Sequence, residues 1–330
     1  MAEMISNLKL QDSDPPIDAK GLAIVGARPK TLGERIRSHA VLYLLFLPVL
    51  TYFLLIRFWP ITLSFIVSFK DLRLGLGIWN SQWIGFRNFQ DIFSDPEIVQ
   101  VIRNTIEISL LRLGVGFVPP IFLAIMFHDM TTQSFKKITQ TIVYIPHFLS
   151  WVVIYGMVFA IFATGTGLIN NVVRALGGQQ VEFLLNKNAF RPILIGSALW
   201  KGLGWGTIIY LAALSAVDPG LYEAAIIDGA GPLKRIRHIT FPSILPVITF
   251  VFTITLGFLL FAGGEQVLLF YNYAVYDVAD IIDTWVYRVG LSRFQLSIGT
   301  AMGFIQSTFG MVLLITANYL ARRYTDRGIW

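Results

Sequence analysis

The chain has 330 residues, of which 55% are hydrophobic and only 14% charged, with a formal net charge of +6 and a mean hydropathy of +0.64. A soluble domain carries about 25% charged residues, so this composition excludes a soluble enzyme or a nucleic-acid binder and predicts a polytopic membrane protein. The absence of cysteine also excludes a disulfide framework and a zinc–thiolate site.

Six apolar segments are long enough to cross a bilayer, which takes about 20 helical residues. In chain order they are 41–69, 104–127, 138–163, 192–214, 247–271 and 296–320. The second contains Pro119 and Pro120, which we expect to kink it because each proline removes a backbone donor. The pattern therefore predicts an all-α polytopic membrane protein with about six transmembrane helices.

Lys and Arg residues favour one side of these spans. Because such residues concentrate in cytoplasmic loops, the bias predicts that both termini are cytoplasmic. We expect a cytoplasmic N-terminal tail over 1–40 and a transmembrane domain over 41–330, with a cytoplasmic loop at 215–246. The tail has no early apolar core, so a cleavable signal peptide is not expected.

Two segments on the opposite side, 85–98 and 272–293, could form short surface helices. In the first, the spacing of Phe86, Phe89 and Ile92 suits an amphipathic helix lying against the membrane. Ordinary loop packing explains that spacing equally well.

An intramembrane enzyme would need a nucleophile with a base or a metal site. His147 lies inside a predicted span with Ser150 three residues on, so on a helix the two could touch, but nothing nearby would orient the base. A structural hydrogen bond is the simpler interpretation. The glycine-rich segments lack the Gly-Lys-Ser/Thr ending that binds phosphate, so energy from ATP would have to come from another chain.

The loop at 215–246 carries the most specific local signals. Asp218 and Pro219 can start a helix, Ala224 and Ala225 propagate it, and Gly229 is suited to end it. Gly231-Pro232 then starts another helix. Small residues in a short cytoplasmic helix–turn–helix favour close docking to another protein, although a simple structured loop is the alternative.

These residues resemble the cytoplasmic signature of permease subunits of bacterial ABC importers. Glu223-Ala224-Ala225, Gly229, Ile239 and Pro242 occur at the family spacing, with Phe241 where the family has Leu. Asp228-Gly229-Ala230 is similar to the maltose-type carbohydrate-uptake branch. Segments 144–151, 210–214 and 283–291 resemble a subgroup that includes importers of alginate and uronate oligomers.

The resemblance implies the type I permease fold of ABC importers and a loop that couples to an ATPase, through the residues Glu223, Ala224, Ala225, Asp228 and Gly229. It implies no catalytic residue, metal or cofactor on this chain, because ATP and Mg would be bound by the partner ATPases. The implied partners are a second permease subunit in a heterodimer, two ATPase subunits, and a periplasmic or extracellular solute-binding protein. The implied location is the bacterial cytoplasmic (inner) membrane.

Polar residues inside predicted spans are candidates for the substrate pathway. Lys201 and Trp205 lie one turn apart, where a ring could stack on a sugar and the cation could pair with a carboxylate. Lys201 could equally line a wet cavity or pair with a partner's carboxylate, and Arg57 and Arg112 could bind substrate or extend toward the nearer surface. The remaining candidates for the pathway are Gln266, Tyr271, Asn272 and Gln306.

The sequence therefore predicts a permease subunit of an ATP-driven importer of oligosaccharides, with acidic ones such as uronates or alginate as the narrower expectation. An ABC permease for another solute, such as a polyol phosphate, is the alternative within transport. A homo-oligomeric membrane channel is the alternative outside that class, and it would act without an ATPase.

Overall fold

The computed structural model describes residue 33 and residues 39–325, in two units that divide between Leu63 and Ser64. Nearly all of the predicted tail over 1–40 lies outside the described residues. The predicted boundary at residue 40 therefore stays a prediction.

The first unit contains one apolar helix that continues to the unit boundary and a few residues beyond. Its parts are α3 (Ala40–Tyr52), the π-helical segment η1 (Phe53–Phe58) and α4 (Trp59–Ser68). Together they form a 29-residue helix, which contains an 18-residue stretch of mean hydropathy 2.1. This helix coincides with the first predicted span, and at about 1.5 Å per residue it is long enough for the bilayer core.

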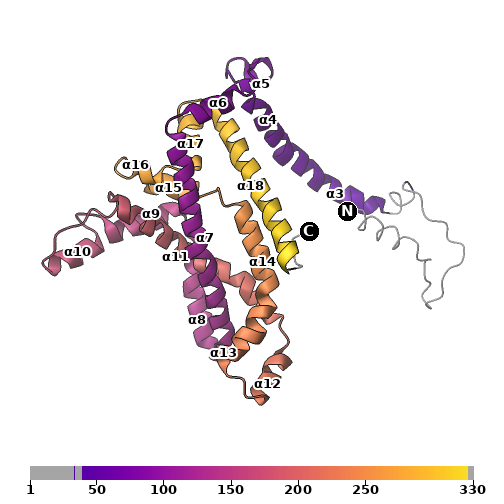
Figure 1. The fold of residues 1–330 in the computed structure, drawn as a ribbon, viewed down its shortest axis with the longest axis vertical. Helices are drawn as coiled ribbons and strands as arrows, with labels where there is room; N and C mark the ends of the chain where they lie inside the picture. Colours follow the sequence, from indigo (N-terminus) through magenta and orange to yellow (C-terminus); the bar gives the residue numbers. More distant parts are fainter. Residues whose placement is uncertain (1–32, 34–38, 326–330) are drawn as a thin grey trace, which may run out of the picture. The chain divides into compact units, whose positions relative to one another are not determined.

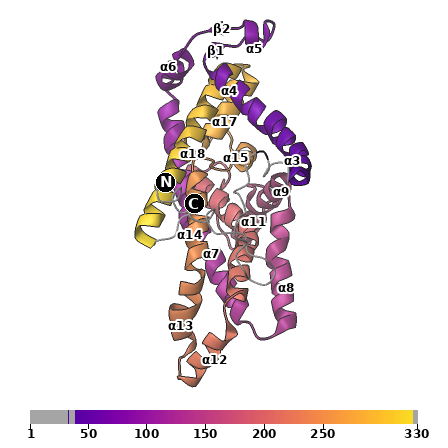
Figure 2. The same cartoon turned by 90° about the vertical axis from the view of Figure 1, so that its right-hand side faces the viewer.

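After the last residues of α4, the second unit contains a small antiparallel hairpin and then helices (Figures 1 and 2). Lys70 pairs with Trp83 in the hairpin. The elements are β1 (Lys70–Asp71), α5 (Gly77–Asn80), β2 (Gln82–Trp83), α6 (Arg87–Ser94), α7 (Ile98–Asp129), α8 (Gln133–Tyr144), η2 (Ile145–Phe148), α9 (Trp151–Phe162), α10 (Leu168–Ala175), α11 (Lys187–Ser215), α12 (Pro219–Ile227), α13 (Pro232–Arg235), η3 (Ile236–Thr240), α14 (Phe241–Gly257), α15 (Gly264–Phe270), α16 (Tyr276–Ala279), α17 (Ile282–Val286), η4 (Tyr287–Ser292) and α18 (Leu296–Thr325).

The predicted count of six spans is not confirmed. Four described helices are long and apolar enough to cross a membrane, and a fifth is added only if one bent pair of helices counts as a single span. α11 covers the predicted fourth span with 29 residues but is not among them. Its middle holds Lys201 and the glycines at 202, 204 and 206, which lower its apolar content.

The third predicted span is wrong as a continuous helix. The helix through α8 and η2 ends at Phe148, and α9 leaves it at an angle of 104°. Ser150 caps α9, since its hydroxyl accepts a hydrogen bond of 3.3 Å from the amide of Val153. His147 and Ser150 therefore do not share a helix face, which removes the geometry that a nucleophile and base would need.

The fifth predicted span is also placed wrongly. The helix that is long enough to cross runs from Pro232 to Gly257, so it begins inside the segment predicted as a cytoplasmic loop. It stops well before Tyr271, because the chain turns over residues 258–263. Gly263 then starts α15 with a φ of +83°, a conformation that glycine adopts without steric cost.

Three clusters of buried apolar side chains hold the second unit together, and α7 contributes to all of them. Ile108 packs with α9, α11 and α15, Ile98 packs with α6, α17 and α18, and Ile121 packs with α11 and α14. The predicted surface helix is present as α6, with Ile92 buried in the second cluster. Its contact with a membrane surface stays a prediction.

Candidate functional site

The start of α12 follows from its local sequence. Asp218 is the N-cap, and its Oδ1 accepts a hydrogen bond of 2.9 Å from the amide of Gly220. Pro219 occupies the first turn, where a missing backbone donor costs nothing. The helix start predicted at this pair is confirmed.

The end of α12 is set by Gly229, which has a φ of +73°. The amide of Ala230 donates to the carbonyl of Ala225 at 2.8 Å, and the amide of Gly229 donates to the carbonyl of Ile226 at 3.0 Å. This pair of bonds is the Schellman arrangement, which satisfies the last carbonyls of a helix and needs a residue in the left-handed region. The helix end predicted at Gly229 is confirmed, and the next helix starts at Pro232 as expected.

The α12 tip is hydrophobic and open. Ile227 is 85% exposed and Ile226 56% exposed, while Glu223, Ala224 and Asp228 are also exposed. Figure 1 shows α12 at one end of the second unit, opposite α5 and α6. Large apolar side chains at a polar loop tip are typical of a protein-binding surface.

One side chain ties the α12 tip to the rest of the unit. The hydroxyl of Tyr222 lies 3.1 Å from that of Thr240 at the end of η3, and its ring centroid lies 5.4 Å from that of His128 at the end of α7. Tyr222 thus joins α12 to the end of α7 and to the segment η3 that leads into α14.

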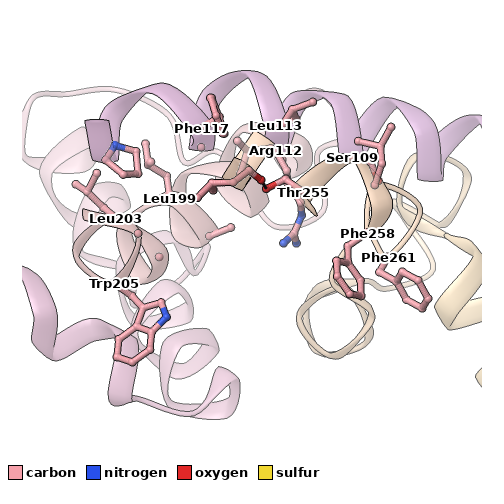
Figure 3. A pocket seen from close by; sticks show the side chains of 18 of the residues that line it. Ser109, Arg112, Leu113, Phe117, Leu199, Leu203, Trp205, Thr255, Phe258 and Phe261 are labelled. Carbon is pink, nitrogen blue, oxygen red and sulfur yellow. Dashed lines mark hydrogen bonds between the residues drawn. The ribbon is translucent and has the colours of Figure 1, made fainter. Parts of the chain in front are cut away.

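A cavity of about 550 Å³ lies between α7, α11 and α14. It is mostly apolar, with aromatic rings at both ends in the close-up of Figure 3. The residues that line it are Ser109, Arg112, Leu113, Gly116, Phe117, Pro120, Ile195, Ala198, Leu199, Gly202, Leu203, Trp205, Gly206, Ile209, Tyr210, Val251, Thr255, Phe258, Leu259 and Phe261. Arg112 is the one charged residue among them.

Lys201, a predicted substrate residue, does not line this cavity. Its ammonium donates to the carbonyl of His147 at 2.8 Å and also to the carbonyl of Leu149. It lies 5.4 Å from the ring centroid of Trp151 as well. The cation therefore binds the backbone where α8 and α9 meet at 104°, which fits a structural role for Lys201.

Trp205, like the candidate residue Arg112, lines the cavity. It is 53% exposed, and its ring stacks on that of His147 with centroids 4.3 Å apart and an angle of 4°. The break between α8 and α9 therefore positions this ring at the cavity wall.

The two predicted glutamines are buried and occupied by the protein itself. Gln266 donates to the carbonyl of Leu194 at 2.8 Å and to the hydroxyl of Ser197 at 2.9 Å, and it accepts from Arg112. Gln306 donates to the carbonyl of Leu260 at 2.8 Å and to Asp283 at 2.9 Å. Gln266 therefore joins α15 to α11 and α7, and Gln306 joins α18 to the turn between α14 and α15.

Tyr271 and Asn272 lie at the end of α15, outside the cavity. Asn272 donates to the carbonyl of Leu184 at 3.0 Å and accepts from the amide of Ala274 at 3.0 Å. The ring centroid of Tyr271 lies 6.0 Å from that of Tyr276. The structure therefore brings two of the residues suggested by the sequence, Trp205 and Arg112, to the cavity.

An ionic network lies on the side of α15–α17, and no sequence signal indicates it. Arg288 donates to Asp280 at 2.6 Å, where both side chains are largely buried, and to Glu97 at 3.0 Å. Burial raises the pKa of Asp280, although hydrogen bonds from Thr284 and Arg288 oppose that shift. The hydrogen bond from Lys187 lowers the pKa of Asp277. These pairs join η4 to the residue that follows α16 and to the residue that precedes α7, and they join α16 to α11.

Among the described residues, no group of three or more His, Asp or Glu side chains is placed to hold a metal ion.

Comparisons with known proteins agree with this arrangement. Residues 116–326 match the family model described as the binding-protein-dependent transport system inner membrane component. Protein LplB of Bacillus subtilis is 39% identical over 88% of this chain and 91% of its own length. The polygalacturonan/rhamnogalacturonan transport system permease protein YteP of the same organism is 39% identical over 96% of this chain and 98% of its own.

Solved structures give the same result. A crystal structure of a bacterial alginate ABC transporter, in complex with an alginate pentasaccharide-bound periplasmic protein, contains a chain with a TM-score of 0.83 and 35% identity. That match covers 91% of this chain and all of the other. The MetNI methionine ABC transporter, at 15% identity and a TM-score of 0.52 over 70% of this chain and 98% of the other, shows the shared fold alone. This chain therefore belongs to the family of binding-protein-dependent transport system inner membrane components, as a permease subunit of an ABC importer and not an enzyme.

Proposed function

We propose that this permease imports oligosaccharides, and among them acidic ones built from uronates. The observation that carries the proposal is the near full-length similarity, at 39% and 35% identity, to a permease named for polygalacturonan and rhamnogalacturonan transport and to a chain of an alginate transporter. Polygalacturonan and alginate are both polymers of uronic acids. A cavity lined by aromatic rings and one cation is chemically suited to such a ligand.

The same proposal assigns coupling to the α12 tip. Ile226 and Ile227 offer exposed apolar surface, Ala224 and Ala225 permit close approach, and Glu223 and Asp228 offer charges to a basic partner surface. An ATPase subunit that binds this tip could move α7 and α14 through Tyr222, which contacts the end of α7 and the segment η3 that leads into α14. Closure of two ATPases would then switch the permeases between inward-open and outward-open states as rigid bodies.

The proposed assembly contains this chain, a second permease, two ATPase subunits that bind ATP and Mg, and a solute-binding protein outside the inner membrane. Both termini would be cytoplasmic. The similarity to a chain of an alginate ABC transporter, solved in complex with a periplasmic protein, supports this set of partners. A homo-oligomeric channel is set aside because the family consists of importer subunits.

A polyol phosphate is the second candidate substrate. The sn-glycerol-3-phosphate transport system permease protein UgpA of Yersinia pestis is 27% identical over 87% of this chain and 94% of its own length. A phosphate would also suit the single cation of the cavity. The lower identity places this candidate behind the oligosaccharides.

The test is to purify the tagged chain in mild detergent, identify the subunits that accompany it, and reconstitute them in proteoliposomes. Uptake is then compared for trigalacturonate, an alginate trisaccharide, maltotriose and glycerol 3-phosphate. ATP-dependent uptake of either uronate trisaccharide supports the proposal. Uptake of maltotriose alone would refute the acidic part, and uptake of glycerol 3-phosphate alone would refute the oligosaccharide part.

The coupling assignment predicts the behaviour of Ile227→Glu. Because Ile227 is 85% exposed, the change should leave the fold intact and place a charge in the ATPase contact. We expect at least a tenfold loss of ATPase co-purification and of uptake. Leu176→Glu is the matched control, since Leu176 is 82% exposed at the end of α10. Full ATPase binding by Ile227→Glu would contradict the assignment.

A further inference from the structure

We propose that Arg112 is a carboxylate-binding residue of the transport cavity, an inference that rests on the proposed uptake of uronate oligosaccharides. Arg112 lies on α7 and is the one charged residue among those that line the cavity between α7, α11 and α14. In the view of Figure 3 its guanidinium points away from α7, between Trp205 on one side and Phe258 and Phe261 on the other.

The hydrogen bonds of Arg112 are incomplete. The Nη2 of Arg112 donates to Gln266. Its buried Nε has no hydrogen-bond partner among the residues that the structure describes. The hydroxyl of Ser109, on the same cavity wall, is likewise buried without a described partner. Buried donors left unpaired cost about 1–3 kcal/mol each, so a ligand that drew either group toward the cavity and paired with it would recover that cost.

The protein does not neutralise Arg112 directly. No salt bridge to Arg112 is found within the described part of the chain, although Asp283 is close enough to act on it electrostatically. A Cβ on Gly263 would lie 2.5 Å from Nη1 of Arg112, and one on Gly264 would lie 2.5 Å from Cβ of Asp283. Gly263 therefore packs against the guanidinium and Gly264 against Asp283, and without a direct ion pair to the protein Arg112 can take up an anion from the cavity.

The surroundings favour a sugar acid over a small inorganic anion. The cavity of about 550 Å³ is large enough for a few sugar units, and Trp205, Phe117 and Phe258 supply flat apolar surfaces for sugar faces. In such a low-dielectric site an arginine–carboxylate bond is strengthened, and the fork of the guanidinium matches a carboxylate. Lys201, which the sequence favours for this role, is occupied by backbone carbonyls of the bend between α8 and α9.

The experiment uses the complete importer in proteoliposomes, with trigalacturonate or an alginate trisaccharide as probe, whichever the wild type takes up faster. We expect Arg112→Lys to retain most of the uptake. Arg112→Gln should reduce uptake about ten- to hundredfold, which is the effect of losing one charged hydrogen bond to the substrate. Arg112→Cys gives a direct test, because the chain has no other cysteine. A cationic aminoethyl thiosulfonate adduct should restore uptake, and the neutral hydroxyethyl adduct should not.

A second position keeps the test informative if variants of Arg112 fail to assemble. Gly116 lines the cavity one turn from Arg112, and a Cβ there would meet nothing within 4 Å. In Gly116→Cys an anionic sulfonate adduct should pair with Arg112 and inhibit uptake at least tenfold more than a cationic adduct. Gly114→Cys is the control, because Gly114 is equally open on the same helix but does not line the cavity. Because this chain has no native cysteine, any effect of the reagents on uptake by the wild-type importer measures their reaction with the partner subunits.

The outcomes separate this inference from the proposed function. If the wild type takes up neither uronate trisaccharide, the proposed acidic substrate fails. If the wild type takes one up and Arg112→Gln does so equally well, or if both adducts of Arg112→Cys restore uptake alike, the assignment of Arg112 is overturned while the proposed function stands. Equal inhibition by the two adducts of Gly116→Cys would overturn it as well.

Discussion

Replacing Lys201 by methionine tests whether this cation holds the bend between α8 and α9. The change keeps the length of the side chain but removes two hydrogen bonds, to the carbonyls of His147 and Leu149. Charged hydrogen bonds contribute about 1.5–3 kcal/mol each, so even at the lower end the loss is about 3 kcal/mol. The contact of the ammonium with Trp151 adds to it.

The assay is thermal unfolding of the purified importer in detergent, followed by tryptophan fluorescence, together with uptake of acidic and neutral oligosaccharides. We expect Lys201→Met to lower the unfolding midpoint by several degrees and to reduce uptake of both substrates equally. Lys137→Met, at an exposed position of α8, is the matched control. An unchanged midpoint with selective loss of acidic uptake would show that Lys201 meets the substrate, and the structural argument would be refuted.

Two further changes test other parts of the site. Gly229→Ala forces a side chain onto a φ of +73°, which costs about 1–2 kcal/mol, so we expect substrate-stimulated ATPase activity to fall. Gly231→Ala, at a φ of −66°, is the control and should keep that activity. Equal activity of the two variants would contradict the requirement for a left-handed residue at 229. Arg288→Met leaves Asp280 buried without its ion partner, which costs about 3–5 kcal/mol, and the double variant with Asp280→Asn should regain part of that loss in the thermal midpoint. Additive losses would show that the two side chains do not stabilise each other.

The limits of α12 could be predicted from sequence because helix capping is local. Asp218, Pro219 and Gly229 act on backbone groups within a few residues of themselves, so their neighbours in the chain are sufficient to interpret them. The apolar character of the first, second and sixth spans is also a property of the segment itself. The same reasoning fails for the third and fifth spans, where apolar residues continue through a bend at Phe148 and a turn at residues 258–263.

The roles of polar residues inside the membrane were decided by the tertiary structure alone. Lys201, Gln266 and Gln306 look alike in sequence, as polar side chains in apolar segments. Each meets backbone carbonyls exposed by a bend or turn elsewhere in the chain, or a side chain far away in sequence.

The amino-acid sequence by itself indicated a membrane permease, because its composition predicts membrane spans and the residues from Glu223 to Pro242 resemble the permease signature. A polar side chain can bind a ligand only if the protein does not already occupy its hydrogen bonds. That depends on where other helices bend or end, because their backbone carbonyls lack helical partners at those points. Lys201 meets such carbonyls at residues 147 and 149, whereas Arg112 passes beside Gly263 and reaches the cavity. Only folding brings these distant segments together, so only the tertiary structure could distinguish the two cations.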